Sequence, residues 1–230
     1  MLSEDENMKD GIVIQARTGS TRLHNKILLP FDGERCILDI LIGNIKAAFP
    51  EMCIVLATTV RKQDDVLEET ARKLGIHCFR GDEDNVLDRF IKAGEAFGLD
   101  RMVRVCSDNP FLQPDSFKTL LNAHDELPAD YVAFGFEDGR PTIKSHLGLF
   151  VEVTTLDALK RIAKVTQEKL YVEHVTNLCT LIPKSFPFVC CRYPIIWKEG
   201  LTCVSRSIQW TILRCSRICM LILRLSMEAE

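Results

Sequence analysis

The chain has 230 residues, which suffices for one large domain or two small ones and favours a sizeable hydrophobic core. Its composition, 47% apolar and 27% charged residues, is ordinary for a soluble globular protein. The formal net charge of -3 argues against nucleic acid or an anionic membrane surface as a partner, so any phosphate binding must come from a local cluster of cations.

Ten cysteines do not predict a disulfide framework, because their spacings are irregular and several lie inside apolar runs. The first seven residues are acidic and polar, the opposite of a secretory signal. No apolar run approaches the roughly 20 residues that span a bilayer. We therefore expect a cytoplasmic protein with reduced thiols.

Residues 1–10 are predicted to form a flexible tail, after which apolar strands alternate with amphipathic helices. This alternation predicts an α/β fold with a largely parallel sheet covered on both faces. The expected strands are residues 12–14, 53–58, 76–79 and 102–106, and the expected helices are 37–49, 64–74, 86–97 and 116–124. After residues 131–136 the pattern loosens into a loop or excursion at 139–149, a strand at 150–153, a helix at 156–165 and the start of another helix in 171–178.

Two polar clusters follow predicted strands, where parallel sheets collect their ligands. The first surrounds Gly19 with the cations Arg17, Arg22 and Lys26, and suits a polyphosphate. The second contains Asp108, a hard oxygen ligand of the kind that Mg²⁺ prefers. Taken singly, the first cluster also fits a tight turn and Asp108 a helix cap.

The segment from Gln15 to Lys26 reads QARTGSTRLHNK and resembles the signature of the cytidylyltransferase family that makes CMP-activated sugars. It is most similar to the spore-coat polysaccharide biosynthesis protein F group, relatives of the acylneuraminate and 3-deoxy-manno-octulosonate cytidylyltransferases. The sugar-phosphate guanylyl- and uridylyltransferases carry a Gly-Gly pair in this loop, which is absent here. The resemblance covers residues 11–200, with further similar segments at 57–59, 79–89, 103–110, 148–153 and 173–176.

The resemblance implies the three-layer, Rossmann-like, mixed and mostly parallel sheet of the nucleotide-diphospho-sugar transferase fold. The implied reaction is CTP plus a sugar, with an acidic sugar favoured, giving a CMP-sugar and pyrophosphate with Mg²⁺ as cofactor. The implied role is surface polysaccharide or glycan biosynthesis, and the implied assembly is a homodimer. No nucleic acid or membrane partner is expected.

Carried over by position, the resemblance implies catalytic roles for Arg17, Lys26 and Asp108. Arg17 and Lys26 would contact the phosphates, and Asp108 would hold the metal. The remaining nucleotide-binding positions implied by the loop are Gln15, Ala16, Gly19, Ser20 and Arg22. His24-Asn25 stands where the family usually has Pro-Gly before the lysine, which leaves the path of the loop open.

Outside the loop, the resemblance places Arg80 near the nucleotide, and a solvent-exposed helix-facing charge is the equal alternative. Glu152, Glu173 and His174 would line the sugar side. For His174 a packed or capping histidine is an equally good interpretation. No general base is assignable.

Residues 202–230 differ in character from the rest, with four Arg, three Cys and no Lys, Asp, Gly or Pro. In a shifted reading frame, each codon is made of the last base of one present codon and the first two bases of the next. From residue 202 this shifted frame can encode Leu-Arg-Leu-Ser-Val, and at the junction of Trp210 and Thr211 it must encode Asp. We therefore predict a cytidylyltransferase-like domain over 11–201 and a frameshifted ending beyond it. The lost segment would hold a second metal-binding Asp in the family. The alternative is a divergent tail that packs in its own way.

Two other functions remain open from the sequence. A glycosyltransferase on the same fold should carry an Asp-x-Asp metal motif after a strand, and Asp82-Glu-Asp84 is the only crude candidate. A non-catalytic nucleotide-binding relative is favoured by the altered ending.

Overall fold

The computed structural model of the chain describes residues 8–19, 23–127, 129–136, 141–142, 150–181 and 188–192. All of them belong to one compact unit that ends at Arg192. The first strand, β1 (Asp10–Gln15), begins inside the segment predicted as a tail. Lys9 is also held there, since its backbone N–H donates to Asp100 Oδ2 at 2.9 Å. The predicted boundary at residue 202 lies outside the described residues.

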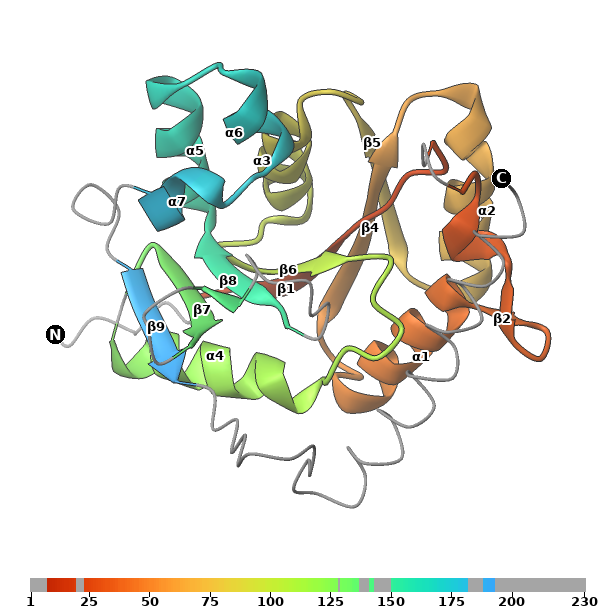
Figure 1. The fold of residues 1–230 in the computed structure, drawn as a ribbon, viewed down its shortest axis with the longest axis horizontal. Helices are drawn as coiled ribbons and strands as arrows, with labels where there is room; N and C mark the ends of the chain where they lie inside the picture. The colour runs from red at the N-terminus through yellow and green to blue at the C-terminus, as the bar shows by residue number, and fades with distance from the viewer. Residues whose placement is uncertain are drawn as a thin grey trace, which may run out of the picture. The chain divides into compact units, whose positions relative to one another are not determined.

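A seven-stranded mixed sheet forms the middle layer and confirms the predicted fold class (Figure 1). The four strands β5, β4, β1 and β6 are parallel to one another. Next to β6, β8 runs antiparallel to both β6 and β7, and β9 pairs parallel to β7. Beyond β1 the strands are β4 (Cys53–Thr59), β5 (His77–Gly81), β6 (Arg101–Cys106), β7 (Tyr131–Gly135), β8 (Glu152–Thr155) and β9 (Phe188–Arg192).

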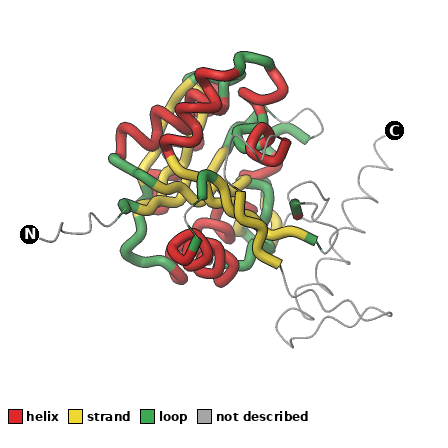
Figure 2. The backbone as a smooth tube through the Cα atoms, turned by 90° about the vertical axis from the view of Figure 1, so that its left-hand side faces the viewer, coloured by secondary structure: helices red, strands yellow, loops and turns green. Residues whose placement is uncertain are grey.

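Helices cover both faces of the sheet, which makes the three layers seen edge-on in Figure 2. On one face α1 contacts α2, and Phe49 after α1 stacks on Phe117 of α4 with ring centroids 5.3 Å apart. On the other face α3 packs against α5 and α6. The helices are α1 (Ile37–Ala48), α2 (Asp65–Leu74), α3 (Val86–Phe97), α4 (Asp115–Glu126), α5 (Leu156–Val165), α6 (Lys169–Glu173) and α7 (Asn177–Leu181).

The first part of the chain folds as its local signals predict. At the start of α3, the Asn85 side chain accepts a hydrogen bond from Asp88 N at 2.9 Å, a standard N-cap. The helix ends at Gly98, whose φ of 62° suits a residue without a side chain. Val13, Phe90 and Met102 are fully buried between α3 and the sheet, so the apolar periodicity correctly marks the core.

The second half departs from the predicted elements. The single helix expected in 171–178 is two short helices, because His174, after α6, has a ψ of 72° that is not helical. Thr176 in the break turns its hydroxyl to Glu152, 2.7 Å away, and this tertiary bond outweighs the weak local periodicity. The predicted strand at 150–153 begins only at Glu152. Strands β7 and β9 were not predicted. The structure also contains a hairpin and two short 3-10 helices that were not predicted. The hairpin is β2 (Pro30–Asp32) and β3 (Arg35–Cys36), and the 3-10 helices are η1 (Lys26–Leu28) and η2 (Lys62–Asp64).

In the described parts of the chain, the free thiols include Cys36, Cys53, Cys78, Cys106 and Cys179. Burial raises the pKa of Cys78 to about 11 and that of Cys179 to about 12, so neither is a reactive thiolate at neutral pH. Within the same ranges, no helix is long and apolar enough to cross a membrane.

A buried polar cluster that contains a histidine lies at the amino end of β6. Arg101 pairs with Asp10 at 2.7 Å and with Asp125 at 2.5 Å, and its Nη1 lies 3.0 Å from Nδ1 of the buried His124. Burial, and then the neighbouring Arg101 cation, lower the pKa of His124 below its ordinary 6.5, while Asp10 and Asp125 oppose this shift. His124 is therefore neutral in the folded chain.

We expect His124 to make the folded chain less stable as the pH falls. An unfolded chain takes up a proton at His124 below about pH 6.5, whereas the folded chain resists doing so. The contribution of the neutral His124 to the free energy of unfolding is therefore fully present above that pH, and it is lost as the pH falls through the lower pKa of His124 in the folded chain. We expect the free energy of unfolding in urea to fall less steeply between about pH 7.5 and pH 5 in His124→Gln than in the wild type. Parallel pH profiles for the two proteins would contradict this assignment.

Candidate functional site

The carboxyl ends of β5, β4, β1 and β6 meet at one edge of the sheet, because these strands are parallel and in register. The polar segments that follow them are residues 16–26, 60–64, 82–85 and 107–110. The structure thus brings the two sequence-predicted clusters together. Ser107 N donates to Gln15 O at 3.1 Å, which joins the start of both loops directly.

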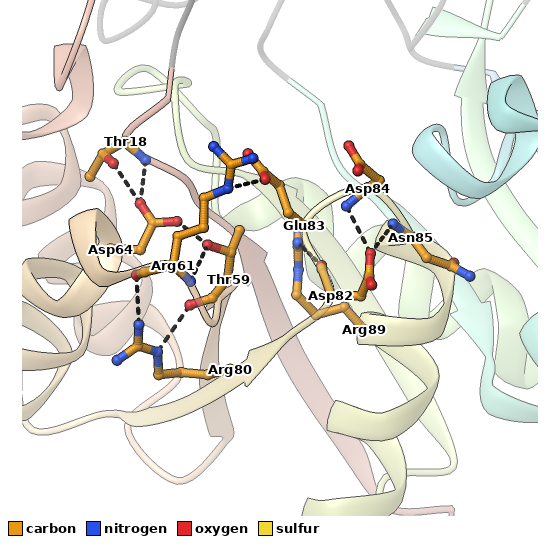
Figure 3. Close-up of polar contacts among 10 residues, drawn as sticks. All are labelled: Thr18, Thr59, Arg61, Asp64, Arg80, Asp82, Glu83, Asp84, Asn85 and Arg89. Carbon is orange, nitrogen blue, oxygen red and sulfur yellow. Dashed lines mark hydrogen bonds and ion pairs between the residues drawn. The ribbon is translucent and has the colours of Figure 1, made fainter.

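Asp64 holds the loop after β1 in place from a buried position (Figure 3). Its Oδ1 accepts from the backbone N–H of Thr18 at 2.8 Å and from the Thr18 hydroxyl at 2.6 Å. Its Oδ2 accepts from the hydroxyl of Thr59 at the end of β4. A carboxylate with both oxygens used in this way fixes the loop relative to the sheet. Sequence reasoning missed Asp64, which read only as the first residue of a helix.

Replacing Asp64 by asparagine should loosen this anchor. An amide of the same size accepts at one atom only and turns a donor toward one of the two hydroxyls. We expect Asp64→Asn to lower the free energy of unfolding by about 2 kcal/mol, because charge-assisted bonds are lost at a buried site. Urea denaturation measures the loss. The neighbouring Asp65 pairs with Arg80 at the surface, so Asp65→Asn should change stability by less than about 1 kcal/mol. Equal effects of the two variants would contradict the anchoring role.

The loop closes through a left-handed residue. Asn25 has a φ of 55°, and its N–H donates to Thr18 O at 3.1 Å. Asparagine tolerates this conformation better than any residue except glycine, which is the family's usual residue at this position. The replacement of Pro-Gly by His24-Asn25 therefore still delivers Lys26 to the start of η1.

Two backbone N–H groups of the loop already donate hydrogen bonds within the chain and are not available to a ligand. Ala16 N–H donates to Ala57 O at 3.1 Å, and Thr18 N–H is taken by Asp64. Gly19 lies beside η2, where an added Cβ would stand 3.2 Å from the side-chain amide nitrogen of Gln63. The predicted ligands Ser20 and Arg22 lie outside the described residues.

Both described cations of the loop face carboxylates. Lys26 Nζ lies 2.7 Å from Asp108 Oδ2, and both side chains are about two-fifths exposed. Arg17 Nη2 lies 3.9 Å from Glu173 Oε1 across the site. The structure therefore brings Lys26 to the predicted metal ligand, and Arg17 to a predicted sugar-side residue. Each cation can exchange its exposed carboxylate for a phosphate with little loss.

Asp108 fits a magnesium ion held mainly by its substrate. The carboxylate follows β6 on an exposed loop, and no group of three or more His, Cys, Asp or Glu gathers anywhere in the described ranges. Mg²⁺ commonly takes one or two carboxylates together with phosphate oxygens and water. The donor set is thus compatible with a metal bound jointly by Asp108 and a nucleotide.

Glu152 does not line an open surface, which corrects the predicted sugar contact. It is 1% exposed, and its Oε2 accepts from Arg104 Nη1. Its Oε1 accepts from the hydroxyls of Tyr131 and Thr176. Arg104 Nη2 also donates to Gln15 Oε1 at 3.3 Å. This internal network links the nucleotide loop to the break between α6 and α7.

Arg80 fits the predicted helix-facing alternative, and His174 fits the predicted capping alternative. The guanidinium of Arg80 donates to Thr59 O at 2.9 Å and Arg61 O at 2.8 Å, and pairs with two carboxylates of α2. It serves to join α2 to the sheet, and its assignment to the nucleotide gains no support. His174 is exposed at the end of α6, which rules out the packed interpretation.

The acidic run after β5 is a turn rather than a metal motif. Asp82 Oδ1 accepts from the N–H groups of Asp84 and Asn85 at 2.8 and 2.7 Å, and these bonds, the one from Asn85 first, hold the pKa of Asp82 below its usual value. Glu83 pairs with Arg61. Two of the three acidic side chains are therefore engaged within the chain, which weakens the glycosyltransferase interpretation (Figure 3).

Comparison with known proteins identifies the family of the chain. The model of the family described as cytidylyltransferase matches residues 12–190. An uncharacterised protein of Methanocaldococcus jannaschii is 40% identical over 164 residues, which are 71% of this chain and 64% of that protein. The spore coat polysaccharide biosynthesis protein SpsF of Bacillus subtilis is 37% identical over 169 residues, 71% of this chain and 67% of its own length. The chain thus spans about two thirds of these relatives.

A solved structure of a cytidylyltransferase from Leptospira borgpetersenii superposes with a TM-score of 0.74 at 26% identity. The superposition covers 82% of this chain and 77% of that one. The two chains therefore share the fold over most of their lengths.

Proposed function

This chain belongs to the cytidylyltransferase family, and we propose that it transfers CMP from CTP to a sugar, releasing pyrophosphate. The observation that carries the proposal is the meeting of Lys26 and Asp108 at 2.7 Å beside the loop that Asp64 anchors. Nucleotidyl transfer from a triphosphate requires a phosphate-binding cation and a metal-binding carboxylate at one point.

The ligand-free pairs suggest how the nucleotide is received. Lys26 and Arg17 are neutralised by Asp108 and Glu173 in the free chain. Phosphate oxygens of CTP take the place of these carboxylates, so the cations stay paired throughout. Asp108 is then free to hold Mg²⁺, which would neutralise charge on the phosphates. Glu173 is released toward the sugar side at the same moment.

The transfer itself relies on positioning. The sugar hydroxyl attacks the α-phosphorus, its oxygen–phosphorus bond forms, and the bond to the pyrophosphate leaving group breaks. Arg17 and Lys26 offset the negative charge on the phosphates during this exchange. The rigid attachment of Thr18 to Asp64 keeps the loop in register with the end of β4. Mg²⁺ dependence, an acidic sugar, a role in surface polysaccharide or glycan synthesis, and a homodimer are parts of the proposal that the resemblance supports.

Pyrophosphate release tests the proposal. The protein is incubated with CTP, Mg²⁺ and a panel of sugars that includes acidic ones, with UTP and GTP as matched nucleotides. The proposal expects release that depends on CTP, on Mg²⁺ and on one class of sugar. Transfer of a sugar from a nucleotide-sugar donor would favour a glycosyltransferase. CTP binding with no release for any sugar would favour the non-catalytic alternative.

The altered ending bears on how much activity to expect. If residues 202–230 are frameshifted, the second metal-binding Asp of the family is missing and Mg²⁺ affinity should be low. The coding DNA decides this directly, since stop codons in the shifted frame would exclude the frameshift.

A further inference from the structure

Arg89 is a buried arginine that the proposed mechanism does not yet use. It lies one turn into α3, and its residue is 0% exposed. Its Nη1 donates to Asp82 O at 2.6 Å. Its Nε and Nη2 have no hydrogen-bond partner among the residues that the structure describes. A buried guanidinium with two unsatisfied nitrogens is costly, since donors taken out of water normally find acceptors.

The two unpartnered nitrogens form one recognition edge. In a guanidinium, Nε–H and one N–H of Nη2 point in parallel directions. Together they form a fork that donates hydrogen bonds to two oxygens of an oxyanion. The bond from Nη1 to Asp82 O orients the group and leaves this fork unused. Figure 3 shows the side chain rising from α3 beside Asp82 and Glu83, toward the end of the sheet where Thr18 also lies.

The surrounding chain makes room for Arg89 and sets another cation near it. An added Cβ at Gly81 would stand 3.0 Å from Arg89 Cγ and 3.3 Å from its Cβ, so the stem packs over the glycine. Burial, and next the positive charge of Arg17, lower the pKa of Arg89, while Asp64, Asp82 and Glu83 partly oppose this. The guanidinium of Arg89 thus keeps two unpartnered nitrogens in a position where it also feels the charge of Arg17.

We propose that Arg89 is a further anion-binding residue of the nucleotide site, and that its free fork takes a phosphate group of the triphosphate together with Arg17. This inference rests on the proposed use of a nucleoside triphosphate. The fork is covered in the free chain, so side chains at the edge of the site must move before a phosphate reaches it. Arg17 is suited to move, because the ion pair that it makes among the described residues is a 3.9 Å contact with Glu173 between two partly exposed side chains.

Stability and binding should respond in opposite directions when Arg89 is changed. Arg89→Met keeps an unbranched stem and removes the charge and the fork. The ligand-free variant should melt at the same or a higher temperature than the wild type, since an unsatisfied buried charge disappears. Its affinity for CTP and for inorganic tripolyphosphate, measured by calorimetry, should fall roughly 10- to 100-fold. Arg89→Lys keeps a charge without a fork and should lie between the two.

Arg101 provides the matched control. It is equally a buried arginine, but it is fully engaged with Asp10 and Asp125 at the opposite end of β6. Arg101→Met should lower the melting temperature and leave affinity for CTP and tripolyphosphate unchanged in the protein that remains folded.

The outcomes separate this inference from the proposed function. A lower melting temperature of Arg89→Met with unchanged tripolyphosphate affinity would show a purely structural arginine and overturn the inference. Equal losses of affinity for CTP and for cytidine would place the base at the fork and overturn it too. If the wild type prefers another triphosphate to CTP, the proposed function fails, while the tripolyphosphate comparison still tests Arg89. A wild type that binds neither CTP nor tripolyphosphate overturns both.

Discussion

Asp108→Asn is expected to reduce pyrophosphate release at least about 100-fold, because a metal ion contributes several kcal/mol of charge stabilisation and an amide is a poor ligand for Mg²⁺. Folding should change little, since the side chain is two-fifths exposed and bonds only to Lys26 among its described contacts. Removing the carboxylate also frees the Lys26 ammonium for phosphate. Affinity for CTP without Mg²⁺ should therefore stay equal or rise, while the Mg²⁺-dependent rate falls.

The matched control for this change is Asp115→Asn. Asp115 is exposed in the first turn of α4, seven residues further along the chain, and contributes only a favourable charge at a helix start. The rate of pyrophosphate release by Asp115→Asn, and the dependence of that rate on Mg²⁺, should equal those of the wild type. If Asp108→Asn kept the wild-type rate at the wild-type Mg²⁺ concentration, Asp108 would not be the metal ligand.

The first half of the fold could be predicted because its signals are local. Residues 12–14 are a continuous apolar run, and residues 102–106 are apolar except for Arg104. The helix over 86–97 has apolar periodicity with a capping Asn85 and a closing Gly98. Such features need no knowledge of distant parts of the chain. The meeting of Lys26 with Asp108 was predictable for a related reason, since each follows a parallel strand and the strands end at one edge.

The supporting residues could not be predicted because their partners are distant. Thr18 and Asp64 are 46 residues apart, and Arg104 and Glu152 are 48 apart. Read locally, Asp64 is a helix start and Glu152 is the acidic residue of a family-like segment. Only the sheet order, which inserts β8 between β6 and β7, brings Arg104, Glu152 and Tyr131 side by side.

The placement of Tyr131 beside Glu152 changes the pKa of the tyrosine hydroxyl. The residue is fully buried on β7, and burial, followed by the Glu152 carboxylate, raises the pKa of its hydroxyl well above the usual value. The hydroxyl is therefore always protonated and serves as a fixed donor to Glu152 Oε1. A sequence pattern of apolar residues could identify the strand but not the charge that its tyrosine would meet.

Glu152→Leu is expected to lower the free energy of unfolding by about 3–5 kcal/mol, the usual effect of removing one partner of a buried ion pair. Arg104, whose side chain is 8% exposed, would keep its charge and lose its carboxylate. The hydroxyls of Tyr131 and Thr176 would lose their acceptor as well. Urea denaturation measures this loss. Hydrogen exchange should rise in residues 169–181, because the bond to Thr176 no longer holds the break between α6 and α7.

A double-mutant cycle separates the ion pair from the packing around it. Arg104→Met should be destabilising alone, since it leaves the Glu152 carboxylate buried and uncompensated. In the double variant neither charge remains, so its loss of stability should be smaller than the sum of the two single losses by about 2–3 kcal/mol. Strict additivity would mean that the pair contributes through volume alone. A coupled pair would instead make the position of the Gln15 side-chain amide, which Arg104 also contacts, depend on the Glu152 carboxylate of β8, and so connect the end of β1 to the second half of the chain.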